Sequence, residues 1–131
     1  MDIMKHVFNH DKKSITDLGT LRIENRVIAS ISSMAASGVD EVASVGTGIN
    51  RLFQLLGLKL SPSGVKVKVD HNEIKINVPI SAKYGANLPR LASLVQESVK
   101  REIERMTGLS TVEVNVDIRG VVKTETRMEV K

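Results

Sequence analysis

The sequence predicts an α+β fold, a two-layer sandwich in which a mixed β-sheet has helices packed on one face. Two segments carry apolar residues at helical spacing and end at a glycine, Gly38 or Gly108. Every expected strand alternates apolar with polar residues, which is typical of a sheet covered on one side only. The expected order is β-α-β-(α)-β-β-α-β, and the length of 131 residues favours a single domain.

Three parts are expected along the chain: a loose N-terminal arm over 1–18, the α+β domain over 19–121, and a polar C-terminal tail over 122–131.

The absence of cysteine excludes disulfides, thiolate metal sites and cysteine catalysis, and it fits a reducing cytoplasm. No stretch reaches signal-peptide character or the roughly 20 apolar residues of a membrane span. We therefore expect no direct membrane span.

The first elements are short. Residues 20–23 favour a strand, and residues 25–37 favour a helix that ends at Gly38. Residues 39–45 alternate and predict a second strand. The side of the helix expected to be buried comprises Val27, Ile28, Ile31, Met34 and Ala35.

The segment after Gly46-Thr47-Gly48 carries one apolar stripe at helical spacing, formed by Ile49, Leu52, Phe53, Leu56 and Leu60. Most such stripes belong to the core. The alternative is a partner-docking surface, for which a protein is a better candidate than a lipid because only Arg51 and Lys59 are basic. The two glycines do not form a phosphate loop, because Arg51 stands where a dinucleotide motif needs glycine.

A β-hairpin is predicted next. Alternate valines over 65–69 and alternate apolar residues over 74–80 flank the turn residues Asp70-His71-Asn72. Lys66, Lys68 and Lys75 are expected on its outer face, as a small basic patch. Pro79 falls on the same outward set and indicates an edge or a bulge, because proline donates no ladder hydrogen bond.

The most informative segment is the final helix and strand. Asn87 is a good N-cap, Pro89 suits the first turn, and Gly108 suits the end. The apolar face is expected to contain Leu91, Leu94, Val95, Val99, Ile103 and Met106. The following strand places Glu113, Asn115, Asp117 and Arg119 on its polar side. We expect a mixed-charge outer sheet face, which is either simply solvated or paired with a second copy.

No set of residues predicts catalysis, a metal site or a cofactor. The acid pairs Glu102/Glu104 and Glu113/Asp117 have basic neighbours and favour solvated surface, and His6 and His10 have helical spacing without a third ligand. The net charge of +4 is diffuse and aromatics are scarce. Both observations argue against a nucleic-acid partner.

The chain resembles the alkaline shock protein 23 / general stress protein 24 family of bacterial envelope stress response proteins. The matching pieces are GTLRIENRVIASISSMAASGVDEVASV over 19–45, GVKVKV and IKINVPISAKYGANLPRLASLVQESVKREIERMTGL within 64–109, and STVEVNVDIRGV over 110–121. The tract YGANLPRLA and the segment VEVNVDIRGV are the most specific of these. The resemblance spans most of residues 19–121.

This resemblance implies a non-enzymatic cytoplasmic protein of cell-envelope homeostasis, acting by self-association and by docking to other proteins near the inner face of the cell membrane. Its implied partners are a membrane-anchor protein, through which it contacts the membrane peripherally, or acetyl-CoA carboxylase in fatty-acid supply. The family offers no catalytic residues. A KH-like nucleic-acid-binding module remains a further alternative, although the chain has no GxxG clamp between two helices.

Overall fold

The computed structural model describes residues 13–16, 18–46, 64–70, 73–110 and 112–123. These ranges contain six strands and two helices. In chain order they are β1 Lys13–Thr16, β2 Gly19–Arg22, α2 Asn25–Ser37, β3 Val42–Val45, β4 Lys66–Asp70, β5 Glu73–Lys83, α4 Leu88–Thr107 and β6 Val112–Val122.

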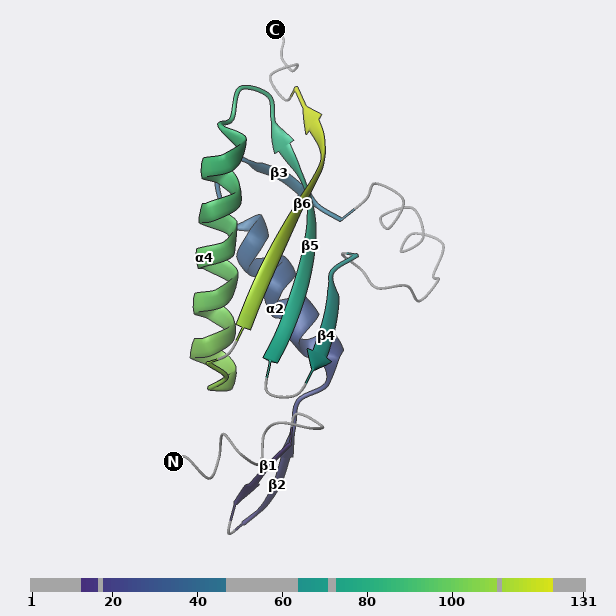
Figure 1. Ribbon diagram of the computed structural model, residues 1–131, viewed down its shortest axis with the longest axis vertical. Coiled ribbons are helices and arrows are strands. Elements are labelled where there is room, and N and C mark those ends of the chain that lie inside the picture. Colours follow the sequence, from purple (N-terminus) through teal and green to yellow (C-terminus); the bar gives the residue numbers. More distant parts are fainter. Residues whose placement is uncertain (1–12, 17, 47–63, 71–72, 111, 124–131) are drawn as a thin grey trace, which may run out of the picture.

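The main sheet has four strands arranged around β5 (Figure 1). Strand β6 pairs parallel with β5 along one edge, from Ile74↔Val112 to Lys83↔Val122. The other edge of β5 is shared by two antiparallel strands, with β4 beside residues 73–77 and β3 beside residues 80–82. The predicted mixed sheet is confirmed.

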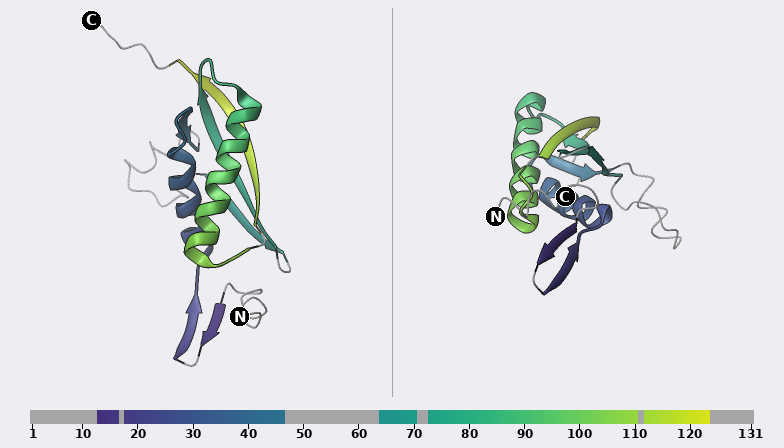
Figure 2. Two further views of the ribbon diagram at one scale, coloured as in Figure 1. Left: turned by 90° about the vertical axis from the view of Figure 1, so that its left-hand side faces the viewer. Right: turned by 60° about the horizontal axis from the view of Figure 1, so that its bottom comes forward.

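Both helices pack on one side of this sheet, and they also pack against each other (Figure 2). Helix α2 contacts β3, β4 and β5, whereas α4 contacts β6. The residues between the layers are fully or almost fully buried, and they include Ile28 of α2, alternate residues 74–82 of β5, and Leu91, Val95, Val99 and Ile103 of α4. The predicted two-layer α+β sandwich is therefore confirmed.

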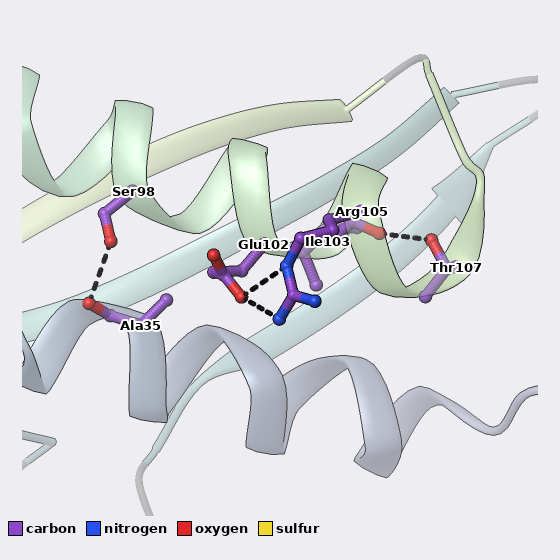
Figure 3. A network of polar contacts seen from close by, with 6 residues as sticks. All are labelled: Ala35, Ser98, Glu102, Ile103, Arg105 and Thr107. Atoms are coloured by element: carbon purple, nitrogen blue, oxygen red, sulfur yellow. Dashed lines mark hydrogen bonds and ion pairs between the residues drawn. The ribbon is translucent and has the colours of Figure 1, made fainter.

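Helix α4 begins and ends as its sequence predicts. The Asn87 side chain accepts a hydrogen bond from the Arg90 N–H at 3.0 Å, and Pro89 occupies the first turn. Gly108 adopts the left-handed conformation at φ 80° and donates its N–H to the Glu104 carbonyl. Near the middle of α4, the Ser98 hydroxyl donates to the Ala35 carbonyl at 3.0 Å and joins the two helices (Figure 3).

The expectation of an irregular arm is wrong for Lys13–Thr16. These residues form β1, which pairs antiparallel with β2 in a separate two-stranded sheet. A strand is recognised in a sequence when apolar and polar residues alternate, because one of its faces is buried. The β2 residues are exposed throughout, so this two-stranded sheet gives no such signal on the β2 side. Residues 1–12 lie outside the described ranges.

The buried face of α2 is rotated from the predicted one. Ile28 and Ile31 are buried, but Val27 and Met34 are 44% and 67% exposed. Their places are taken by small residues, namely Ala29, Ser32 and Ala36. Small side chains allow close packing, and the Ser32 hydroxyl donates to the Ile28 carbonyl at 2.8 Å, so it is not left unsatisfied. In α4, Leu94 and Met106 are likewise exposed, at 39% and 58%.

Two strand boundaries also differ from expectation. Strand β3 begins at Val42, because Val39 and Val42 donate hydrogen bonds to the Ala36 and Val39 carbonyls in a turn after α2. Strand β6 continues to Val122, whose carbonyl accepts from the Tyr84 N–H at 2.8 Å. Residue 122 is therefore in the sheet rather than in a polar tail.

Pro79 lies in the central strand, so the edge alternative is wrong, whereas a register shift close to it is consistent with the bulge alternative. Strand β4 pairs with β5 as far as Asn77, and β3 pairs from Ile80 onwards. Pro79 pairs with Asp117 of β6 on one side, and on the other it falls in the gap between β4 and β3, so neither of those strands requires its missing N–H. Its carbonyl accepts a hydrogen bond from the Gly46 N–H at 2.7 Å, and the β5–β6 register shifts just beyond it, between Ile80 and Ser81.

Candidate interaction surface

The polar surface of the main sheet lies on the side opposite the helices, and we call it the outer sheet face. Its residues come from three adjacent strands and are Lys66, Lys68, Lys75, Asn77, Glu113, Asn115, Asp117 and Arg119. They alternate along each strand with the apolar residues that face the helices. The expected mixed-charge face is thus assembled by the register of the sheet.

The register brings the three lysines of the predicted basic patch together. Lys68 lies directly opposite Lys75, and Lys66 lies opposite Asn77, the next outward residue of β5. Lys66 and Lys68 are exposed, whereas Lys75 is half-buried. Lys75 also lies beside Glu113 of β6, which limits the positive field of the patch. A binding role for these lysines remains a prediction.

Strand β6 carries two polar contacts along its outer side. Asn115 Nδ2 donates to Glu113 Oε2 at 3.2 Å. Arg119 Nε donates to Asp117 Oδ2 at 2.8 Å, and both side chains are more than half exposed. Exposed pairs of this kind add little stability, so their charges remain available to a partner.

A shallow hollow of about 320 Å³ lies on the outer sheet face. It is lined by Gly64, Lys66, Asn77, Pro79, Asn115, Val116, Asp117 and Arg119. Two cations, two amides and one carboxylate provide hydrogen-bond donors and acceptors of both signs. This chemistry suits polar side chains of another protein, and the lining contains no nucleophile with an adjacent base.

The predicted docking stripe Ile49, Leu52, Phe53, Leu56 and Leu60 lies outside the described residues, as do the three histidines. Within the described ranges, no group of three or more histidine, cysteine or acidic residues is suited to hold a metal ion. No helix within these ranges combines the length and the apolar character that a membrane span requires.

Glu102 and Arg105 form an ion pair on the surface of α4, with 2.7 Å between Arg105 Nη2 and Glu102 Oε1 (Figure 3). The hydrogen bond from Arg105 lowers the pKa of Glu102 below its ordinary value. The same contact raises the pKa of Arg105. Glu102 is therefore held in its ionised form, which is the opposite of what a general acid needs.

One contact at the edge of the sheet has no signal in the sequence. Gln96 of α4 donates from Nε2 to the Val114 carbonyl of β6 at 3.1 Å. The two residues are 18 positions apart, and their meeting depends on how α4 packs against β6.

Comparisons with known proteins agree with the resemblance. The model of the alkaline shock protein 23 family, described as having a cell envelope-related function, matches residues 13–123. The uncharacterized protein YqhY of Bacillus subtilis is 35% identical over 107 residues, covering 81% of this chain and 79% of YqhY. A stress response regulator gls24 homolog of Streptococcus pyogenes serotype M3 is 29% identical over 113 residues. That alignment covers 85% of this chain but only 63% of the streptococcal protein. A solved MamM CTD structure has a TM-score of 0.47 at 15% identity, covering 74% of this chain and 95% of the other.

Proposed function

Because this chain belongs to the alkaline shock protein 23 family, whose described function is related to the cell envelope, we propose that it is a non-catalytic envelope stress protein. It acts by binding other proteins and further copies of itself. Its place of action is the cytoplasmic side of the cell membrane, which it reaches through a membrane-anchored partner rather than through a span of its own.

The outer sheet face is the observation that carries this proposal. It is the polar side of a sheet whose other side is occupied by both helices. It presents lysines, carboxylates and amides across three strands, and its hollow offers groups of both signs to a partner. Complementary charges across a contact select the partner and its orientation more than they add affinity.

The test compares two charge-reversal variants in a strain that lacks the native gene and is exposed to alkaline or envelope stress. The first combines Lys66→Glu, Lys68→Glu and Lys75→Glu on the outer sheet face. The control combines Arg90→Glu, Lys100→Glu and Arg101→Glu on the exposed side of α4, which changes the net charge by the same amount. We expect the native chain and the control to restore growth, and the first variant to fail.

Equal growth with both variants would contradict a role for the outer sheet face. The proteins bound by the native chain but not by the first variant then identify the function more closely. Envelope proteins are the expected result, and acetyl-CoA carboxylase subunits would instead indicate a role in fatty-acid supply. Retention of nucleic acid with an affinity that falls steeply with salt would contradict a protein-binding role.

A further inference from the structure

Strand β6 forms one edge of the main sheet. Within the described residues it pairs with β5 on one side, while its other side has no strand partner. Its 11 residues make it, with β5, one of the two longest described strands. Helix α4 packs along it on the helix side of the sheet (Figure 2). A long edge strand is a ready template for pairing with another strand.

Two hydrogen bonds give the direction of the β6 backbone groups. The Val114 carbonyl accepts from Gln96, so it points away from β5, whereas the Val122 carbonyl accepts from the Tyr84 N–H and points toward the β5 side. The register shift beyond Ile118 accounts for this change of direction. Because backbone groups alternate along a strand, Val112, Val114, Val116 and Ile118 present their N–H and C=O groups to the free edge.

The outward side chains of β6 are complementary in charge and hydrogen bonding to those of a second β6 strand that runs in the opposite direction. They follow the order Glu113, Asn115, Asp117, Arg119, with Val116 at the centre. In an antiparallel pair centred on Val116, Glu113 lies opposite Arg119 of the second copy, and Asn115 lies opposite Asp117. An acid thus meets a base, and an amide donor meets a carboxylate acceptor.

We propose that the free edge of β6 binds the β6 strand of a second copy of this chain, antiparallel, about a twofold axis through Val116. This rests on the self-association that the proposed function includes, and it names the surface that carries it. Val116 pairs with Val116, and Val114 pairs with Ile118, through the backbone groups that face the edge. The two sheets then form one continuous sheet, and the contact uses the same patch on both copies.

Neighbouring registers are disfavoured by charge. Moving the centre to Asn115 places Glu113 opposite Asp117 of the second copy, and moving it to Asp117 places two Asp117 side chains face to face. Like charges directly opposite each other on paired strands are destabilising. The register centred on Val116 avoids both clashes.

The polar contacts of the single chain can be exchanged for contacts between copies. Asn115 donates to Glu113, and Arg119 donates to Asp117, each within its own strand. In the dimer the Asn115 amide reaches Asp117 of the second copy, and the Arg119 guanidinium reaches Glu113. Each donor keeps a carboxylate acceptor, so the exchange leaves no group unsatisfied.

Gln96 competes with this pairing, because its side chain occupies the Val114 carbonyl that the second copy's Ile118 N–H would use. Covering an edge from a neighbouring helix is a common protection against uncontrolled strand pairing. We expect Gln96→Ala to strengthen self-association several-fold, as measured by analytical ultracentrifugation. Weaker association in this variant would contradict the assignment of the free edge.

The register is tested by disulfide trapping, which is simple here because the native chain contains no cysteine. Glu113→Cys and Arg119→Cys variants are purified separately, mixed, and oxidised mildly. In the proposed register, residue 113 and residue 119 of the second copy form a pair that shares no backbone hydrogen bond. The Cα atoms of such a pair lie about 4.5 Å apart, which permits a disulfide. We expect a cross-linked dimer in the mixture and none with either variant alone, because identical positions then lie roughly 20 Å apart.

A mixture of Glu113→Cys with Asp117→Cys is the register control, and a cross-link there would overturn the proposed register.

Charge reversal gives an independent readout. Glu113→Arg and Arg119→Glu should each weaken self-association, and the double variant should restore it. A chain that self-associates without the 113–119 cross-link would overturn the β6 contact and leave the proposed function standing. A chain that stays monomeric at high concentration would overturn both.

Discussion

At the scale of the residue, exposure in this protein changes sharply between neighbours on one helix. Leu91 and Val95 are 0% exposed beneath the sheet, whereas Leu94, between them in sequence, is 39% exposed. A side chain's place on the 3.6-residue turn therefore decides its energetic role, although all three residues are apolar. An apolar residue at a surface position contributes much less to stability than one in the core.

Leu91→Asp or Val95→Asp is expected to unfold the domain. A buried unpaired charge costs several kcal/mol, against a typical total stability of about 5–15 kcal/mol. Leu94→Asp is the matched control and should change the free energy of unfolding by much less. Urea denaturation followed by circular dichroism measures both effects. Equal losses at positions 94 and 95 would show that the buried face of α4 is assigned wrongly.

At the scale of the element, the two helices end at glycines that are not equivalent. Gly108 after α4 has φ 80°, in the left-handed region, whereas Gly38 after α2 has φ −79° and remains right-handed. No atom lies within 4 Å of a Cβ built on Gly108, and a Cβ on Gly38 makes only ordinary contacts. The two positions therefore differ in backbone conformation rather than in available space.

Gly108→Ala is expected to lower the free energy of unfolding by about 1–2 kcal/mol, which is the cost of a left-handed conformation for a residue with a Cβ. Gly38→Ala should be neutral or slightly stabilising, because alanine adopts its conformation without strain. Thermal unfolding of the two variants beside the native chain measures the difference. A smaller loss at Gly108 than at Gly38 would contradict these conformations.

At the scale of the whole molecule, the main sheet and its two helices form the core, and the β1–β2 hairpin lies apart from it (Figure 1). None of the core residues whose burial the structure describes comes from β2, all of whose residues are exposed. Ile23, just beyond β2, packs against the core.

Removal of residues 1–22 is therefore expected to leave a cooperatively folded domain. Its stability should lie close to that of the full chain, since the β2 side chains are exposed and bury little apolar surface. Thermal unfolding and the dispersion of amide signals in an NMR spectrum measure the result. Loss of cooperative unfolding would show that the hairpin is part of the folding unit.

Much of this architecture could be predicted because its signals are local. The caps of α4, the β4–β5 hairpin and the alternation of β6 each depend on residues a few positions apart. The lysines of the basic patch could be placed together for the same reason. The hollow on the outer sheet face and the Gln96–Val114 contact could not, because they join distant segments.

The sequence by itself determined the strands of the main sheet, its two covering helices and which side of that sheet is polar, because helical and strand periods are carried by neighbouring residues. Only the tertiary structure decided that β6 runs parallel beside β5, that β3 and β4 share the opposite edge, and that Pro79 sits in the gap between them. Strand order and helix rotation depend on packing between distant parts of the chain. Helix α2 buries the small residues Ala29, Ser32 and Ala36 in place of the larger apolar residues expected on its buried face. This rotation of the helix cannot be recognised from the spacing of apolar residues in the sequence.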